Sequence, residues 1–172
     1  MLIVMAGLPG TGKSVLVREV LRTAPGICLD KDVVRPALFP LSELDYTPQQ
    51  DDVCIEAVLL AAAYLFRKDP ARLIFLDGRP FARRHQRQRV LDWAAQLPVP
   101  SLMVECACPE ETARERLERD YGEHPARNRG FALYESLKAH WEPILEPHLI
   151  VDTSQPLERC AIAVLEAIHT AS

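Results

Sequence analysis

The sequence lacks the features of several protein classes. Its cysteines show no C-x-x-C spacing, which argues against a zinc ribbon or a redox cysteine pair. The apolar N-terminus, MLIVMAGLPG, has no basic segment before it and is too short to span a membrane, so we predict a strand there and no membrane partner. The net charge of −4 gives no polybasic signature, so a nucleic acid would have to bind at a local patch.

The cysteines and histidines give no sign of a metal centre. Cys106 and Cys108 stand two residues apart along a predicted strand, so we expect both as buried thiols on one side of it. The five histidines have no H-E-x-x-H or other ligand spacing. An odd number of cysteines favours a reducing compartment, and we therefore predict a cytoplasmic protein. The five cysteines are Cys28, Cys54, Cys106, Cys108 and Cys160.

Length and composition indicate one globular domain. The 172 residues are 48% hydrophobic and 26% charged, which is ordinary for a folded protein. A chain of this size can bury roughly 70% of the surface that its unfolded form exposes. We found no repeat, linker or low-complexity segment, so the whole range 1–172 is predicted to form one domain.

Short apolar runs alternate with helical patterns along the chain. The runs at 2–6, 27–29, 73–76, 101–106 and 149–151 have the length of buried strands. Helices are predicted at 14–22, at 48–67 (from Val53, Ala57, Leu60 and Tyr64) and at 157–168. This alternation predicts an α/β fold with three layers: a five-stranded parallel sheet with helices on both faces.

The most specific motif is the segment 7–14, which matches G-x-x-x-x-G-K-[ST] in full and lies between a predicted strand and a predicted helix. Glycines let the backbone amides turn inward, and the helix start adds positive charge, so the loop would hold the phosphates of ATP. Lys13 would contact the β- and γ-phosphates, and Ser14 would help to hold Mg²⁺. The predicted nucleotide-binding residues in this segment are Gly7, Leu8, Pro9, Gly10, Thr11, Gly12, Lys13, Ser14 and Val15.

A second carboxylate follows the apolar strand at 73–76. Asp77 would lie at the carboxyl end of that strand and face the same crevice as Lys13. It could hold Mg²⁺ through water or orient the acceptor hydroxyl. The alternative is an ordinary Asp-Gly turn formed with Gly78.

The strand at 27–29 is followed by Asp32 and Arg35, one helical turn apart. Asp32 could accept the proton of an attacking hydroxyl, and Arg35 could hold the acceptor. From the residues alone, an equally good interpretation is that Asp32 caps a short helix and Arg35 is solvated.

Arginines concentrate in the windows 79–89 and 114–129. In the first window we expect Arg83, Arg84, Arg87 and Arg89 to form a solvated helix face. In the second, Arg116 and Arg119 lie three residues apart before a break at 121–125, as expected for a lid at about 114–130 that closes over the migrating phosphoryl group.

An aromatic stripe follows the predicted lid. Phe131, Tyr134, Leu137 and Trp141 recur at helical spacing. Such stripes belong to the core more often than to a binding pocket, so we predict a core position for them.

With these residues identified, the chain resembles the small P-loop kinases, which include AAA-type ATP-binding kinases, zeta-toxin-like enzymes and the kinase domain of 5′-hydroxyl polynucleotide kinases. The likeness covers nearly all 172 residues. It runs through the segments GLPGTGKS, DKDVVR, LDGR, CPEETARERLER and HPARNRGFALYESLKAHWEPI.

This resemblance implies a catalytic base at Asp32, a substrate arginine at Arg35, a lid arginine at Arg116 or Arg119, and adenine near 152–154, including Thr153. The predicted acceptor site consists of Asp32, Arg35, Asp77 and Arg79. Arg79 departs from the polynucleotide kinases, which tend to have a small polar residue there. Shikimate kinases have three consecutive glycines after the third strand, whereas this sequence has the single Gly78 there.

The leading hypothesis is a kinase that transfers the γ-phosphoryl group of Mg-ATP to the hydroxyl of a small molecule. A polynucleotide 5′-kinase and a nucleotide-dependent switch with slow ATPase activity remain as alternatives. The second alternative ranks last because Asp32, Arg35 and the paired arginines provide an acceptor side that a switch does not require.

Overall fold

The computed structural model describes residues 1–120 and 130–171. The strands are β1 Leu2–Ala6, β2 Gly26–Asp30, β3 Leu73–Asp77, β4 Ser101–Ala107 and β5 Leu149–Asp152. The helices are α1 Lys13–Thr23, α2 Lys31–Leu38, the 3-10 helix η1 Leu41–Glu43, α3 Pro48–Lys68, α4 Arg84–Ala94, α5 Glu110–Arg119, α6 Phe131–Ala139 and α7 Leu157–Ala171. All five predicted strands are thus confirmed, and each end lies within one residue of the predicted position.

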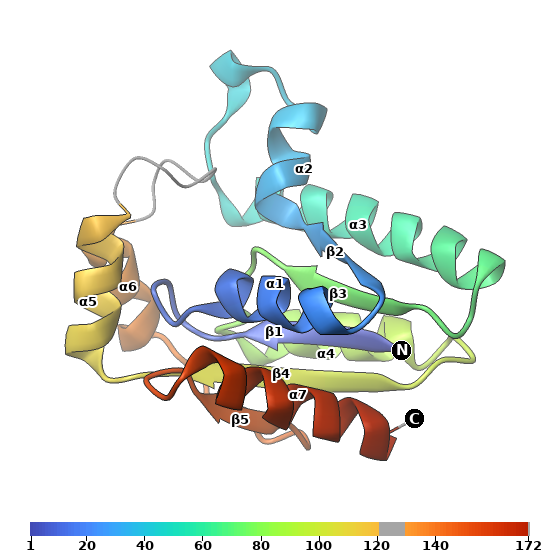
Figure 1. The fold of residues 1–172 in the computed structure, drawn as a ribbon. Helices are drawn as coiled ribbons and strands as arrows, with labels where there is room; N and C mark the ends of the chain where they lie inside the picture. Colours follow the sequence, from blue (N-terminus) through green and yellow to red (C-terminus); the bar gives the residue numbers. More distant parts are fainter. Residues whose placement is uncertain (121–129, 172) are drawn as a thin grey trace.

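Within the described residues the five strands form one parallel sheet in the order β2-β3-β1-β4-β5. Strand β1 is central, and all five of its residues are buried. Helices α1 and α7 cover one face of the sheet and α3 and α4 the other (Figure 1). The predicted three-layer α/β fold is confirmed.

Alternate residues of β1 enter two separate cores. Leu2 and Val4 pack toward α3 and α4, whereas Ile3 and Met5 pack toward α1 and α7. Because side chains alternate across a strand, a sheet covered on both faces needs apolar residues at consecutive positions. The continuous run LIVMA in β1 meets this need.

Helix α3 forms where the sequence predicted a helix, but it is rotated relative to the stripe that predicted it. Val53, Leu60 and Tyr64 are each more than half exposed. The residues that enter the core from α3 are Cys54, Ile55, Val58, Leu59, Ala62 and Phe66. The helix is apolar around much of its circumference, so spacing alone did not identify the face that packs on the sheet.

One of the arginines predicted to be solvated is buried. Arg87 on α4 is fully buried and donates hydrogen bonds to the carbonyl oxygens of Phe81 (2.9 Å) and Pro143 (3.0 Å). Its Nε lies 3.5 Å from a carboxylate oxygen of Glu146. Arg87 therefore joins the segment after β3 to the segment after α6. The prediction of a solvated side chain was wrong here because two carbonyl groups and a carboxylate replace the water.

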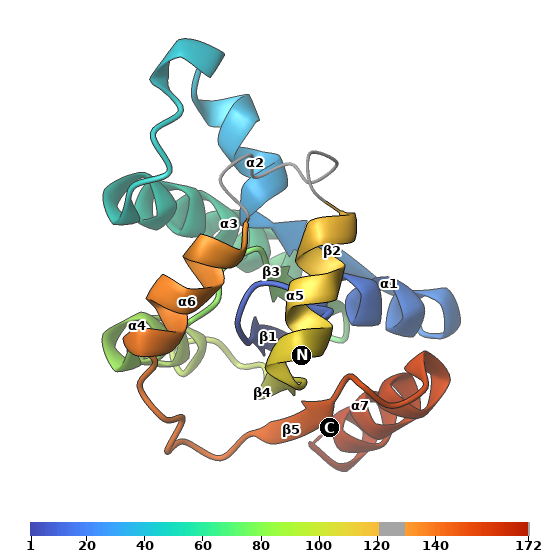
Figure 2. The same cartoon turned by 90° about the vertical axis from the view of Figure 1, so that its left-hand side faces the viewer.

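The carboxyl ends of the strands form the edge that Figure 2 presents to the viewer, with α5 and α6 in front of it. The aromatic stripe contributes to a small core there: Phe131 and Tyr134 stack with ring centroids 5.1 Å apart, beside Ala113 and Leu117. The core position predicted for this stripe is confirmed at Tyr134, which is buried. None of the described helices is long and apolar enough to cross a membrane.

We expect Arg87→Met to lower the stability of the fold by roughly 3 kcal/mol, because two buried carbonyl groups would lose charge-assisted hydrogen bonds. For a chain of this length that corresponds to a fall in the melting temperature of roughly 6–12 °C, measurable by differential scanning fluorimetry. Arg84→Met, an exposed position on the same helix, is the matched control and should change the melting temperature little. Equal effects of both substitutions would contradict the role of Arg87.

Candidate active site

The segment 7–12 forms a loop between β1 and α1, and it follows the backbone path that its glycines allow. Gly7 has φ of 136°, and a Cβ there would lie 2.4 Å from the carbonyl oxygen of Cys106, so only glycine fits. Gly12 precedes α1, and no side chain caps this helix. The positive end of α1 therefore faces the loop, which is the arrangement that binds a phosphate.

The Lys13 side chain folds back over this loop. It is 7% exposed, and its Nζ donates hydrogen bonds to the carbonyl oxygens of Gly7 (2.8 Å) and Leu8 (3.0 Å). The ammonium group is thus held at the inner side of the loop, where a phosphate oxygen would meet it.

Thr153 and Arg116 brace the loop from the side of β5. The Thr153 hydroxyl lies 2.8 Å from the Thr11 carbonyl oxygen and 3.1 Å from that of Ala107. Arg116 on α5 donates hydrogen bonds to the carbonyl oxygens of Thr153 (2.8 Å) and Gly10 (3.4 Å). The two residues therefore contact the loop directly, whereas Arg119 is exposed and pairs with Asp120 at 2.9 Å. Most of the predicted lid, from 121 to 129, lies outside the described residues.

At the end of β3, Asp77 is 1% exposed, and neither of its carboxylate oxygens has a hydrogen-bond partner among the described residues. A buried carboxylate without a partner is costly unless a cation or water meets it. Mg²⁺ in phosphate-binding sites is usually held by one or two protein groups together with phosphate oxygens and water. The Asp77 carboxylate and the Ser14 hydroxyl, which line the same cavity, fit that role.

Asp30 lies beside Asp77 in the register of β2 and β3. Its side chain caps α2 by accepting a hydrogen bond from the Asp32 amide at 2.7 Å. Burial, followed by the charge of Asp77, raises the pKa of Asp30 to about 6. The residue that caps α2 is therefore Asp30, and Asp32 lies inside the helix.

Asp32 and Arg35 are both buried, at 7% and 2% exposure. The interpretation of Arg35 as solvated was therefore wrong. Arg35 Nη2 lies 3.4 Å from Asp32 Oδ1, and Lys31 Nζ lies 2.9 Å from the same oxygen. The Arg35 guanidinium also stacks 4.7 Å from the centroid of the Tyr46 ring.

Asp51, in the first turn of α3, is a site residue that the sequence analysis missed. It pairs with Lys31 at 2.7 Å and with Arg35, so it shares both cations with Asp32. Gln50 adds a hydrogen bond from Arg35 Nη1 at 3.2 Å. The only local signal was an acidic residue shortly after the helix-capping pair Thr47-Pro48, which is common at helix starts and does not indicate an active site.

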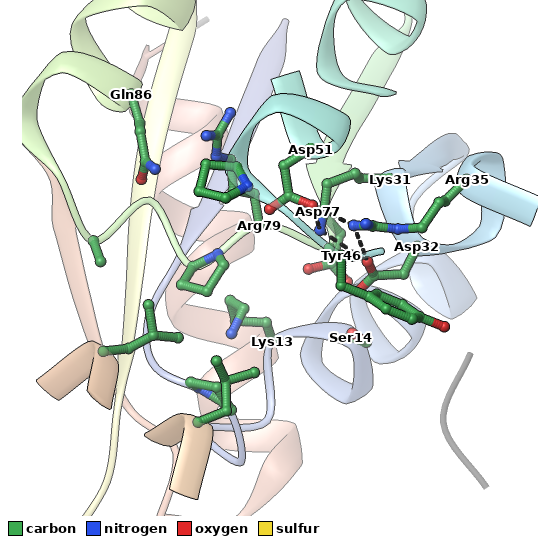
Figure 3. A pocket seen from close by; sticks show the side chains of 17 residues that line it. Lys13, Ser14, Lys31, Asp32, Arg35, Tyr46, Asp51, Asp77, Arg79 and Gln86 are labelled. Atoms are coloured by element: carbon green, nitrogen blue, oxygen red, sulfur yellow. Dashed lines mark hydrogen bonds and ion pairs between the residues drawn. The ribbon is translucent and has the colours of Figure 1, made fainter. Parts of the chain in front are cut away.

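Several of these groups line one cavity of about 310 Å³, drawn in Figure 3; Asp30, Gln50, Arg116 and Thr153 are not part of its lining. The phosphate loop contributes Pro9, Lys13 and Ser14 to its lining. The charged residues of the remaining lining are Lys31, Asp32, Arg35, Asp51, Asp77 and Arg79. Pro48, Pro80, Ala82, Leu133 and Leu137 supply apolar surface. Leu137, from the aromatic stripe, thus also borders the cavity.

A family model described as an AAA domain matches residues 2–142. The chain belongs to this AAA domain family. The match includes the phosphate loop, the acidic ends of β2 and β3, and α5. No curated protein matches the sequence of this AAA domain.

Solved structures with the same fold include several kinases. A Mycobacterium tuberculosis APS kinase in complex with AMPPNP and APS aligns with a TM-score of 0.74 and 18% identity, over 98% of this chain and 96% of the other. A Sinorhizobium meliloti gluconokinase aligns with a TM-score of 0.70 and 18% identity, over 98% and 92%. A sugar kinase from Janibacter aligns with a TM-score of 0.71 and 16% identity, over 98% and 94%. These likenesses show that the AAA domain has the fold of small P-loop kinases.

We expect Asp30→Asn to stabilise the magnesium-free protein at pH 7.5 and to have little effect near pH 4. Because the folded state raises the pKa of Asp30 from 3.8 to about 6, ionisation of this group lowers stability as the pH rises through that range. Removing it should recover roughly 2–3 kcal/mol at pH 7.5. The measurement is the melting temperature of wild type and variant at both pH values, with EDTA present.

Asp45→Asn is the control of opposite sign. Hydrogen bonds from Thr47 lower the pKa of Asp45, so that variant should lose stability at pH 7.5 relative to pH 4. A stabilisation by Asp30→Asn that is the same at both pH values would rule out its ionisation as the cause.

Proposed function

We propose that this protein is a kinase that transfers the γ-phosphoryl group of Mg-ATP to a hydroxyl group of a small molecule. The observation that carries the proposal is that one cavity is lined both by the phosphate loop, through Lys13 and Ser14, and by the carboxylates Asp32 and Asp77. A phosphoryl donor and an acceptor hydroxyl placed there would lie side by side, which is the main requirement of phosphoryl transfer.

Each chemical task of phosphoryl transfer has a residue in this proposal. The loop amides and Lys13 bind the β- and γ-phosphates, and Ser14 and Asp77 hold Mg²⁺. The bound ion would neutralise charge on the phosphates. Asp32 accepts a hydrogen bond from the acceptor hydroxyl and orients it, and Arg35 keeps Asp32 in place. The AAA domain family and the kinase fold of the solved neighbours support this assignment.

The lid arginines have separate roles in the proposal. Arg116 already contacts Gly10 and Thr153, so it would shape the nucleotide side of the loop, with adenine near 152–154. Arg119, at the last turn of α5, is exposed and would reach the transferring phosphoryl group only after the lid closes. Such an arginine commonly contributes ~10³-fold or more to the rate.

The volume of the cavity favours a small acceptor over a polynucleotide. At about 310 Å³ it lies at the lower end of the range typical for small-molecule sites. The resemblance to 5′-hydroxyl polynucleotide kinases supports the roles of Asp32 and Arg35. Phosphorylation of a polynucleotide 5′-hydroxyl therefore stays as the competing hypothesis.

We expect no transfer of label from ATP to 5′-hydroxyl DNA or RNA oligonucleotides at low salt. Labelled oligonucleotides would overturn the small-molecule assignment.

The general test is a metabolite panel incubated with Mg-ATP and screened by mass spectrometry for the gain of one phosphoryl group. We expect a product with wild type and none with Lys13→Ala, because the variant lacks the charge that meets the phosphates. If calorimetry found no binding of ATP or GTP in the presence of magnesium, the proposal would fail. Partner-stimulated ATP hydrolysis without a phosphorylated product would instead indicate a switch.

Asp32→Asn tests the catalytic base. We expect it to retain ATP affinity and to lower kcat by roughly 10²- to 10⁴-fold, because the acceptor hydroxyl loses its proton acceptor. The matched control is Asp51→Asn, which removes a carboxylate from the same two cations, Lys31 and Arg35. That variant should raise KM more than it lowers kcat. A larger loss of kcat in Asp51→Asn than in Asp32→Asn would assign the base to Asp51.

A further inference from the structure

Arg79 is held in an unusual stretch of backbone directly after β3. Gly78 before it has φ of 90°, and Phe81 after it has φ of 56°, a region that bulky residues rarely occupy. The Gly7 amide donates a hydrogen bond to the Pro80 carbonyl oxygen at 3.0 Å, and Arg87 holds the Phe81 carbonyl oxygen. Backbone strain that the surroundings maintain is common at functional sites. Here it fixes Arg79 next to the phosphate loop.

The Arg79 guanidinium is buried with few partners. It is 3% exposed, and among the described residues its one hydrogen bond runs from Nη1 to Asp52 Oδ1 at 2.7 Å. Its Nε is buried and has no hydrogen-bond partner within that part of the chain. Arg35, by comparison, has Asp32, Asp51, Gln50 and the Tyr46 ring around it. Among the described residues, Arg79 thus has fewer partners than Arg35, whose Nε also lacks one.

The carboxylate that pairs with Arg79 is only partly available to it. The Asp52 side chain is 43% exposed and lies 3.8 Å from a second cation, Arg89. This shared, partly hydrated carboxylate offsets only part of the cost of burying the Arg79 guanidinium. Burying a guanidinium with so little compensation is unfavourable, and such a group calls for a ligand or a water to complete it.

Of the cations that line the cavity, Arg79 is paired with a carboxylate, Asp52, that does not itself line it. Lys13 belongs to the phosphates, and Lys31 and Arg35 are neutralised by Asp32 and Asp51. Asp77 would face the metal ion. Arg79 remains, and Figure 3 shows it between Gln86 and the group formed by Asp51, Lys31 and Arg35, on the cavity wall.

Resting on the proposed kinase function, we propose that the acceptor is a small hydroxy acid whose carboxylate binds the Arg79 guanidinium while its hydroxyl faces Asp32. A carboxylate matches the planar arrangement of the guanidinium donors. It also brings one negative charge to a cation that shares its carboxylate partner with Arg89, whereas a phosphate monoester would bring nearly two. The apolar surface of Pro80, Leu133 and Leu137 would contact the carbon chain between the two groups.

The test compares hydroxy acids with the polyols that differ from them only at the carboxylate, such as glycerate with glycerol and gluconate with sorbitol. We expect wild type to prefer the acid of the productive pair by roughly 10- to 100-fold in kcat/KM, the effect of one charge-assisted contact. Arg79→Met should remove this preference mainly by raising the KM for the acid, and should change kcat/KM for the polyol much less. Arg79→Lys should restore part of it.

Arg89→Met is the matched control, because Arg89 shares Asp52 with Arg79 but does not line the cavity. It should leave the preference for the acid intact. Polyols phosphorylated as well as the acids, or an equal loss for both classes in Arg79→Met, would overturn the role of Arg79 and leave the kinase proposal standing. ATP binding without transfer to any member of either class would overturn the hydroxy-acid assignment, whereas the proposed function would fail only if the metabolite panel also gave no phosphorylated product.

Discussion

The burial of β1 on both faces is the constraint on which the rest of the molecule depends. Each of its five residues is enclosed, alternately by α3 and α4 and by α1 and α7. A strand packed in this way cannot slip by one residue without exchanging its two sets of side chains between the cores. The position at which β1 ends, and therefore the position of the phosphate loop, is fixed by apolar packing far from any ligand.

A second level of organisation is electrostatic. Four charged side chains, from α2 and the start of α3, form one cluster, in which Lys31, Asp32 and Arg35 are buried and Asp51 is partly buried. Such a cluster is weak support for stability, since its desolvation offsets much of its attraction. It does hold a carboxylate at a fixed place opposite the phosphate loop. Arg79 and Arg87 extend the same principle to the segment after β3, one facing the cavity and one joining loops behind it.

The parts of the site that the sequence predicted are those encoded by contiguous residues. The phosphate loop is a local motif, and Asp77 follows a strand visible in the sequence, so both could be placed before the structure was known. Asp51 and Asp52 could not, because their role depends on how α3 packs against α2 and the β3–α4 segment, which no local pattern specifies. The burial of Arg87 was missed for the same reason: nothing in the sequence of a charged helix indicates that distant carbonyl groups will enclose one of its arginines.

The Thr153 hydroxyl ties the beginning of the chain to its end. It links the carbonyl oxygen of Thr11, in the phosphate loop, to the turn that leads from β5 into α7. The shape of the phosphate loop thus depends on a residue that is synthesised 142 positions after Thr11. A nascent chain that has not yet reached β5 contains the loop motif without this support, so we expect the loop to bind a triphosphate well only after β5 and Thr153 have joined the sheet.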